Sequence, residues 1–234
     1  MLAIVLNRRD FKEFDQIISL YTSERGKIEA LAKGVKKIIS KQSSHLEPFV
    51  LIEVKVIKGR ELDHIAKISM VNIFKNIRNN LEKSLLANYA VRLVDKMVII
   101  GENDKKIFGL TRSWLEYVDG VAEAEKSLLY SFMVKLLNCL GFAPELEKCV
   151  NCGLSRKNFV GFDIRNGGVH CRDCEKITID KNYFFSLTSG EVNFFKVLLN
   201  GSWEETASHL ANERILDVIV KFARFHCGQK IFSF

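Results

Sequence analysis

Residues 49–57 read Phe-Val-Leu-Ile-Glu-Val-Lys-Val-Ile, a segment rich in β-branched residues in which Glu53 and Lys55 alternate with apolar side chains. A turn follows at Gly59-Arg60, and the run from Leu62 to Val71 alternates in a similar way. Two alternating runs joined by a short turn that contains glycine predict a β-hairpin.

Three further strand-like segments precede this hairpin, at residues 2–6, 17–21 and 27–33. The turn Thr22-Ser-Glu-Arg-Gly26 separates the last two, because Gly26 can adopt positive φ without steric cost. A linker rich in lysine follows the third of these strands. Five short strands with this basic linker predict a small closed barrel of the OB-fold type over residues 1–76. A generic small barrel or half-sandwich fits the same periodicity.

The hydrophobic period changes from about residue 77 onward. Apolar residues at three- and four-residue spacings predict an amphipathic helix: Leu81, Leu85, Leu86, Tyr89, Leu93, Met97 and Ile100. Further helices are predicted over about 104–119, 122–140, 188–199 and 213–227. A capping box at Thr188-Ser-Gly-Glu191 marks the start of the helix at 188–199. The predicted fold class is therefore α+β and multidomain, with an all-α domain over residues 77–234.

Two Cys-x-x-Cys pairs, Cys149/Cys152 and Cys171/Cys174, interrupt the helical domain. The 18 residues between them agree with the spacing of a zinc ribbon. A two-residue gap lets two thiolates of one turn meet a single ion, and a hairpin brings the second pair round to complete a tetrahedron. The spacing predicts a closed, structural four-thiolate Zn²⁺ site in an inserted knob over residues 145–178; a lapsed site or redox pairs are the alternatives.

The remaining cysteines and the neighbouring histidine need no metal role. Cys139 and Cys227 lie among apolar residues and are interpreted as small buried hydrophobic residues. His170 precedes Cys171, but four thiolates already complete a site, so we interpret it as an exposed neighbour.

The composition is that of a packed protein, with 47% hydrophobic and 27% charged residues, and excludes a disordered chain. The sequence contains neither an apolar run long enough to cross a membrane nor a secretory signal, so we expect the reducing cytoplasm. The net charge is +7, and the first 80 residues carry 15 Lys and Arg against 9 Asp and Glu. This basic excess predicts an acidic partner such as nucleic acid, a membrane surface or an acidic protein.

No phosphate-binding loop, dinucleotide-binding turn or zinc-protease helix is present in the sequence. Two carboxylate pairs, Glu13/Asp15 and Glu61/Asp63, resemble part of a Mg²⁺ site for nuclease chemistry, but further acidic ligands would have to come from elsewhere. The sequence thus favours a binding protein over an enzyme, with no small-molecule substrate.

Several motifs resemble the RecO family of bacterial recombination mediators. They are Glu13-Phe-Asp15-Gln-Ile-Ile, Leu20-Tyr-Thr22-x-x-x-Gly26, Ala32-Lys33-Gly34-Val-Lys36-Lys37, Leu46-Glu-Pro48-Phe49, Glu61-Leu62-Asp63-His-Ile65, and the four cysteines that follow Gly141-Phe142-Ala143-Pro144. The resemblance covers essentially the whole chain and is weak beyond about residue 180.

This resemblance implies an OB-fold followed by a helical domain with a zinc-ribbon-like knob. It also implies a protein that binds single- and double-stranded DNA, anneals complementary strands and works with RecR during recombinational DNA repair, in the cytoplasm at the nucleoid. Such a protein engages the acidic C-terminal tail of the single-stranded-DNA-binding protein (SSB) and helps to load RecA. Some family members lack the cysteines, which supports a structural role for the metal.

Basic residues around the predicted barrel could track phosphates while leaving the bases exposed to a second strand. The candidate DNA-binding residues are Arg8, Arg9, Lys33, Lys36, Lys37, Lys41, Lys58 and Arg60. Phe11 and Phe14 are candidates for stacking on bases, although core positions are an equal reading. For the SSB tail, a hydrophobic groove with a basic rim is expected, and Phe184, Phe185, Phe194 and Phe195 could supply it.

Two other functions remain open at this point. One is a zinc-dependent protein-interaction adaptor, in which the basic residues only steer acidic partners. The other is a ligase- or nuclease-like DNA enzyme, which would need a nucleophilic lysine motif or an acidic cluster.

Overall fold

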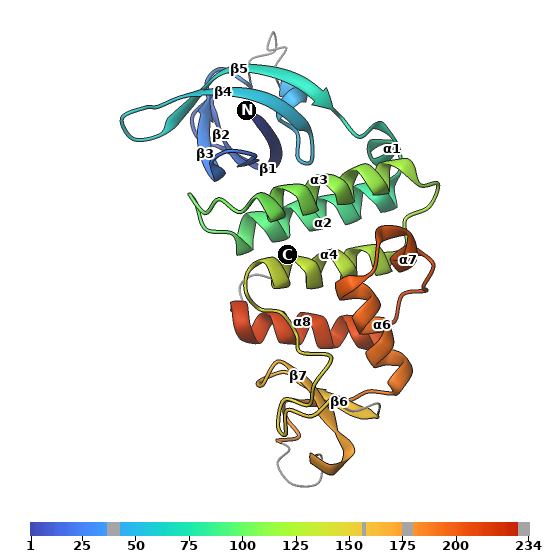
Figure 1. Ribbon diagram of the computed structural model, residues 1–234. Coiled ribbons are helices and arrows are strands. Elements are labelled where there is room, and N and C mark those ends of the chain that lie inside the picture. The colour runs from blue at the N-terminus through green and yellow to red at the C-terminus, as the bar shows by residue number, and fades with distance from the viewer. Residues whose placement is uncertain (37–42, 156–157, 175–179, 229–234) are drawn as a thin grey trace. The chain divides into compact units, whose positions relative to one another are not determined.

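The computed structural model describes residues 1–36, 43–155, 158–174 and 180–228 (Figure 1). Contacts between Cα atoms divide the chain into two compact units, Met1–Ala124 and Glu125–Phe234. The secondary structure changes from strands to helices near residue 75, but the compact units separate about 50 residues later, because two helices pack with the strands.

The first unit contains a closed five-stranded barrel, which confirms the predicted OB-like fold. Its strands follow the order β1-β2-β3-β5-β4, and every pairing is antiparallel except that of β3 with β5. The strands are β1 (Leu2–Asp10), β2 (Gln16–Thr22), β3 (Gly26–Ala32), β4 (Leu51–Ile57) and β5 (Asp63–Asn72), and a 3-10 turn, Ser43–Leu46, precedes β4.

Alternation along the strands fills the barrel. Ile18, Leu20, Ile28, Ile52 and Val54 point inward and are buried in one cluster. Because side chains alternate across a strand, the residues between them point outward. The outer face of β2 and β3 is available to pack against a second layer.

Helices α2 (Leu81–Met97) and α3 (Lys105–Gly120) form that second layer, after the short α1 (Lys75–Arg78). The Ser19 hydroxyl donates to Asp95 on α2, and the Tyr21 hydroxyl donates to the Asp104 carbonyl, 3.0 Å away, at the start of α3. These contacts lie on the outward-facing side of β2. The two helices therefore occupy a face of the barrel that would otherwise be open.

The second unit combines helices with a small sheet. Its helices are α4 (Lys126–Cys139), α6 (Ser189–Asn200), α7 (Trp203–Ala207) and α8 (Glu213–Cys227), and its strands are β6 (Phe159–Asp163), β7 (Gly168–Cys171) and β8 (Phe184–Ser186). The strand order is β7-β6-β8. Phe162 on β6 packs against Phe195 of α6 and Phe222 of α8, with ring centroids 5.3 and 5.5 Å apart, so the sheet rests on the helices.

The helices lie close to their expected positions. The structure confirms the capping box at Thr188 and Glu191, and it adds the five-residue α7, whose sequence is too short to show a period. In the described part of the chain, no helix combines the length and the apolar character that a bilayer span needs.

Candidate functional site

The four cysteines of the two Cys-x-x-Cys pairs come together in the second unit. Their sulfur atoms all lie within 4.8 Å of one another, and Cys152 Sγ and Cys171 Sγ are 3.9 Å apart. A tetrahedron with Zn–S bonds of about 2.3 Å has S–S edges of about 3.8 Å, whereas a disulfide bond measures about 2.05 Å. The spacing therefore fits a metal ion shared by four free thiols, as the donor set of a structural zinc site requires.

Local backbone structure positions this cluster. Cys149 and Cys152 lie on a turn in which Gly153 N–H donates to the Cys149 carbonyl over 2.8 Å, and Gly153 itself has a φ of 72°. Val150 N–H donates to Val169 on β7, which carries the second pair toward the first. Three of the four cysteines are buried and Cys152 is exposed, so the site is closed on most sides.

The surroundings shift the pKa values of Cys149 and Cys174 in opposite directions. Burial opposes ionisation of Cys149, but backbone N–H groups of Cys152, Cys171 and Asn151 outweigh it and lower the pKa of Cys149 to about 6. At Cys174 a contact with the Asn151 side chain lowers the pKa, but burial and the three neighbouring sulfur atoms together raise it to about 12. Four thiolates repel one another, and a divalent cation between them would offset that repulsion.

His170 is not exposed, and this corrects the interpretation from sequence. It is 2% exposed on β7, and its Nε2 lies 3.6 Å from Asp163 Oδ2. All four residues of β7 are buried, because β6 covers one side of this short strand and the cysteine turn covers another. Burial lowers the pKa of His170, and the charge of Asp163 opposes that shift.

The structure also bears on the interpretations of the two remaining cysteines and of the four phenylalanines. Cys139 and Cys227 are half-buried rather than fully enclosed, and burial raises the pKa of Cys227 to about 11. Phe194 and Phe195 are buried in the core, whereas Phe185 lines a surface cleft beside Lys221. A groove shared by all four phenylalanines is therefore excluded.

The carboxylate pairs do not assemble a metal site. Asp15 Oδ1 accepts a hydrogen bond from Gly34 N–H over 2.8 Å, and Asp63 pairs with Arg25 at 2.6 Å. Within the described residues, the four cysteines are the only group of three or more potential metal ligands close to one another.

The structure places the predicted DNA-binding cations at separate positions around the barrel. Lys33 and Lys36 follow β3 and lie beside the loop between β1 and β2, since Lys36 N–H donates to the Phe14 carbonyl and its Nζ lies 2.7 Å from Asp10. Phe11 and Phe14, in that loop, are 42% and 43% exposed, so neither is a core residue.

Arg8 and Arg9 follow one another on β1 and pair with different carboxylates. Arg8 lies 2.6 Å from Glu47, and Arg9 lies 2.9 Å from Glu29 on β3. Consecutive strand residues point to opposite sides, so the two guanidinium groups do not share one surface.

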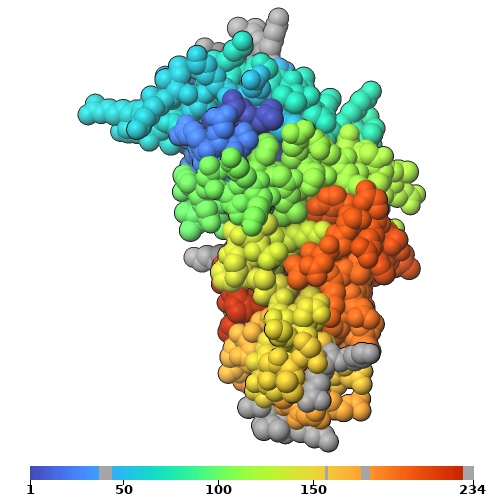
Figure 2. Space-filling model, in the orientation of Figure 1, coloured from blue at the N-terminus to red at the C-terminus, as the bar shows by residue number. Residues whose placement is uncertain are grey.

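Lys58 and Arg60 occupy the turn of the β4–β5 hairpin and are exposed. The hairpin extends away from the barrel, as the ribbon and the space-filling view both show in light blue (Figures 1 and 2). Since Ala30 pairs in parallel with Asp63, this turn lies toward the start of β3, and Lys33 lies toward the other end. Lys37 and Lys41 lie outside the described residues.

The strand register adds two cations that the sequence reading missed. Lys55 on β4 lies directly opposite Lys67 on β5, and both are exposed. With Met1, Glu53 and Ser69 they line a cavity of about 330 Å³. Like charges opposite one another in a sheet are destabilising, so a facing lysine pair suits a site for an anion. The alternation of each strand was visible in the sequence, but the register that pairs them was not.

Comparisons with known proteins agree with this architecture. The family description "Recombination protein O N terminal" matches residues 1–74, and "Recombination protein O C terminal" matches residues 78–233. A "DNA repair protein RecO" from Desulforamulus reducens is 34% identical over 87% of this chain and 77% of its own length. One from Caldanaerobacter subterraneus subsp. tengcongensis is 27% identical over 96% and 91%, and one from Dehalococcoides mccartyi is 35% identical over 74% and 68%.

Together these matches span both compact units, the barrel and the unit that carries the cysteine cluster. The chain therefore belongs to the RecO family of DNA repair proteins.

Proposed function

We propose that this protein is a DNA-binding recombination mediator without catalytic turnover. It binds single- and double-stranded DNA through its barrel, anneals complementary strands and, with RecR, helps to load RecA on DNA coated with SSB. It recognises the C-terminal tail of SSB and acts in the cytoplasm at the nucleoid. Family membership supports this proposal.

The structural observation that carries it is the basic β4–β5 hairpin. Lys55, Lys58, Arg60 and Lys67 extend along this exposed hairpin, and within the described residues none of them forms an ion pair. In contrast, Arg8, Arg9 and Lys36 each have a carboxylate partner. Cations without local partners are available to phosphates, so the hairpin is the strongest candidate for backbone contact.

This arrangement suits annealing. Lysine contacts to phosphates do not depend on the base sequence, so they reduce repulsion between two backbones while leaving bases free to pair. The outer face of β2 around Ser19 and Tyr21 already carries α2 and α3, so we place the strand along the hairpin.

Zinc is proposed to be structural. Cys149, Cys152, Cys171 and Cys174 would hold it in tetrahedral geometry and order the turn and the β7 strand. When bound, the ion supplies no reacting ligand, because four thiolates leave no open position.

Strand annealing on DNA coated with SSB is the decisive assay. Wild-type protein should accelerate annealing, and the double change Lys58→Glu and Arg60→Glu, in the hairpin turn, should weaken single-strand binding and flatten its salt dependence. Unaltered affinity for single-stranded DNA would show that these two residues do not contact it. Absence of any DNA binding in a gel shift would favour a zinc-dependent adaptor, and cleavage or joining of labelled DNA with Mg²⁺ and ATP would favour an enzyme.

A further inference from the structure

A second cationic and aromatic surface lies far along the chain from the barrel, in the second unit. It is a cavity of about 450 Å³, here called the α8 cleft, lined by Tyr183, Phe185, Lys221, Arg224 and Phe225, with Ile164 and Asn182. This volume is within the range of about 300–1,000 Å³ that is typical of sites for small organic groups.

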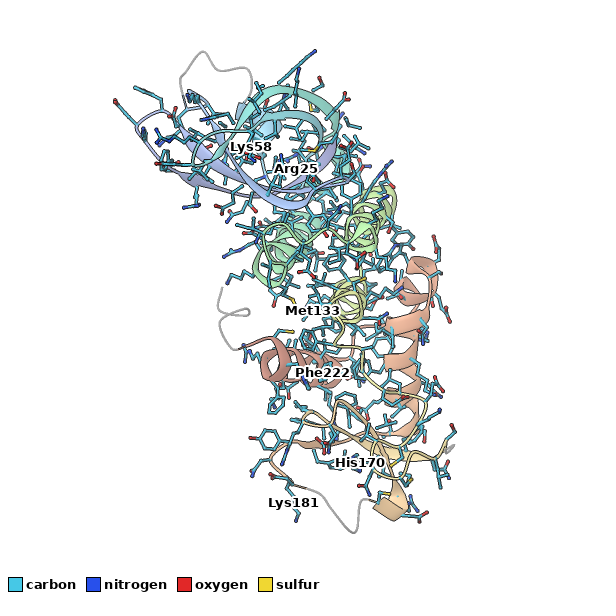
Figure 3. All side chains as sticks on the ribbon, turned by 60° about the vertical axis from the view of Figure 1, so that its left-hand side comes forward. Arg25, Lys58, Met133, His170, Lys181 and Phe222 are labelled. Carbon is cyan, nitrogen blue, oxygen red and sulfur yellow. The ribbon has the colours of Figure 1, made fainter. Side chains whose placement is uncertain are left out.

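One wall of the α8 cleft is a face of helix α8. Lys221, Arg224 and Phe225 are three and four residues apart, so they project from the same side of the helix. The opposite side of α8 is buried, with Phe222 2% exposed against the sheet. Figure 3 labels Phe222 on this buried side. Packing of the buried side therefore holds the cleft side toward solvent.

The other wall is the edge of the small sheet. Tyr183, in the turn just before β8, and Phe185, on β8, both line the cavity. β8 is an edge strand that pairs with β6 alone, and its Ser186 carbonyl accepts a hydrogen bond from Arg214 of α8. Lys181, labelled in Figure 3, lies two residues before Tyr183 and is exposed.

Rings and cations alternate across the α8 cleft. Lys221 Nζ lies 4.6 Å from the centre of the Phe185 ring, and Arg165 Cζ lies 4.6 Å from the centre of the Tyr183 ring. Phe225 is 46% exposed and meets Tyr183 edge-on, with ring centroids 5.5 Å apart. Asp217 and Asp180 hold Lys221 and Arg165 in place at 2.7 and 2.6 Å.

We infer that the α8 cleft binds unpaired nucleotides of a single DNA strand, a second nucleic-acid site separate in sequence from the barrel. Aromatic faces on which bases stack, interleaved with cations for the backbone, are the features that single-strand sites share. The inference rests on the proposed function and deepens it, because annealing brings two strands to one protein and this cleft would hold the second.

Charge favours a nucleic acid strand over an acidic peptide. Arg165, Lys181, Lys221 and Arg224 surround the α8 cleft, but Asp180 and Asp217 lie among them. A strand carries one phosphate per nucleotide and presents an apolar ring between phosphates, which matches alternating cations and rings.

The test uses the full-length, zinc-loaded protein and a short oligothymidylate that contains 5-iododeoxyuridine. On irradiation, mass spectrometry should find cross-links to Tyr183, Phe185 or Phe225 as well as to the barrel. Phe225→Ala and Lys221→Gln should each weaken binding at the cleft by about fivefold or more and reduce the stoichiometry toward one oligonucleotide per protein. Both variants should also slow annealing.

Matched controls test the specificity of these changes. Leu210→Ala removes a side chain that is 83% exposed in the same unit, and Lys126→Gln removes an exposed lysine paired with Glu213. Both controls should leave the cross-links and the stoichiometry unchanged. Circular dichroism verifies that Phe225→Ala is folded.

Three outcomes would overturn the inference. Cross-links confined to the barrel, with normal DNA affinity, would leave the proposed function intact and remove this site. A labelled acidic peptide ending in Phe that binds wild type but not Phe225→Ala, while DNA binding is unaffected, would reassign the cleft to a protein tail. Absence of any cross-link or DNA binding in the wild type would overturn the proposed function as well.

Discussion

Lys27 of β3 places its Nζ 3.2 Å from Oδ1 of Asp95, which lies in the last turn of α2. The same ammonium group donates to the carbonyls of Asp95 and Val98, so it also neutralises the C-terminal end of the helix. Asp95 further accepts hydrogen bonds from Ser19 on β2 and Asn7 on β1. One carboxylate thus connects three strands of the barrel to the helix that covers them.

Replacing Asp95 with Ala should destabilise the first unit by about 2–3 kcal/mol, because it leaves a mostly buried ammonium group without its counter-charge. The Lys27 and Asp95 side chains are only 11% and 17% exposed. Urea unfolding should show the loss as a lower midpoint. Glu82→Ala, in the first turn of the same helix, is the control and should change the midpoint little. Equal stabilities for the two variants would contradict a structural role for Asp95.

Adding a single methyl group at residue 26 should disturb the packing of the start of β3 against the segment that joins α2 to α3. Gly26 has a φ of 63°, and an added Cβ would lie 1.9 Å from the Glu102 carbonyl oxygen. Gly26→Ala should therefore lower thermal stability considerably more than Gly101→Ala, whose φ is 85° but whose Cβ would meet no atom within 4 Å. The left-handed conformation alone costs Ala about 1–2 kcal/mol. A Gly26→Ala variant as stable as Gly101→Ala would show that residues 100–103 shift away readily.

Zinc should be present at one ion per chain in protein prepared under reducing conditions. Cys171→Ser should abolish the binding, whereas Cys139→Ser, outside the cluster, should keep it. Removal of the metal should expose the β6–β7 region to proteolysis, since binding of a structural zinc ion contributes on the order of 10 kcal/mol to ordering its own fold. Metal analysis that finds no zinc in wild-type protein would refute the site.

Charge reversal of the facing lysines should weaken DNA binding. Lys55→Glu with Lys67→Glu is expected to lower affinity for single strands and to reduce the log–log salt slope by about 0.7 for each lost phosphate contact. Lys106→Glu, exposed at the start of α3, changes charge without touching the hairpin and serves as the control. Fluorescence anisotropy across a salt titration measures both quantities. An identical slope for the double variant and the control would exclude the hairpin as a phosphate contact.

The capping box at the start of α6 should make part of the stability dependent on pH. Burial opposes ionisation of Glu191, but hydrogen bonds from the Thr188 N–H and hydroxyl groups and the charge of Arg214 lower the pKa of Glu191 below its ordinary value of 4.5. A lowered folded pKa means that the carboxylate stabilises the folded state above about pH 4.5 and that this contribution is lost as the pH falls.

Glu191→Gln should therefore be less stable than wild type at neutral pH, by about 0.5–1 kcal/mol, and the difference should shrink in acid. Unfolding midpoints at a series of pH values provide the measurement. Glu204→Gln, in the first turn of α7, is the matched control because it removes an exposed carboxylate from the start of another helix in the same unit. A difference that persists unchanged in acid would assign the effect to packing instead of charge.

The linear sequence was sufficient for features that depend on short spacing. Alternation in residues 49–71 predicted the hairpin, and the structure forms it as β4 and β5. The Cys-x-x-Cys pairs predicted a four-thiol cluster, and Cys149, Cys152, Cys171 and Cys174 do meet. In both cases, covalent geometry over a few residues restricts the backbone conformation, so the local sequence pattern is enough to predict the structure.

Features that join distant segments depended on the tertiary structure. Burial of His170, the Lys55–Lys67 pairing and the α8 cleft each require residues from separate elements to meet. Tyr183 and Phe225 lie 42 residues apart, and no local period relates them. Strand register and helix packing are cooperative properties of the whole core, because each contact forms only when the others hold the elements in place, and this is why the sequence alone left these surfaces undetermined.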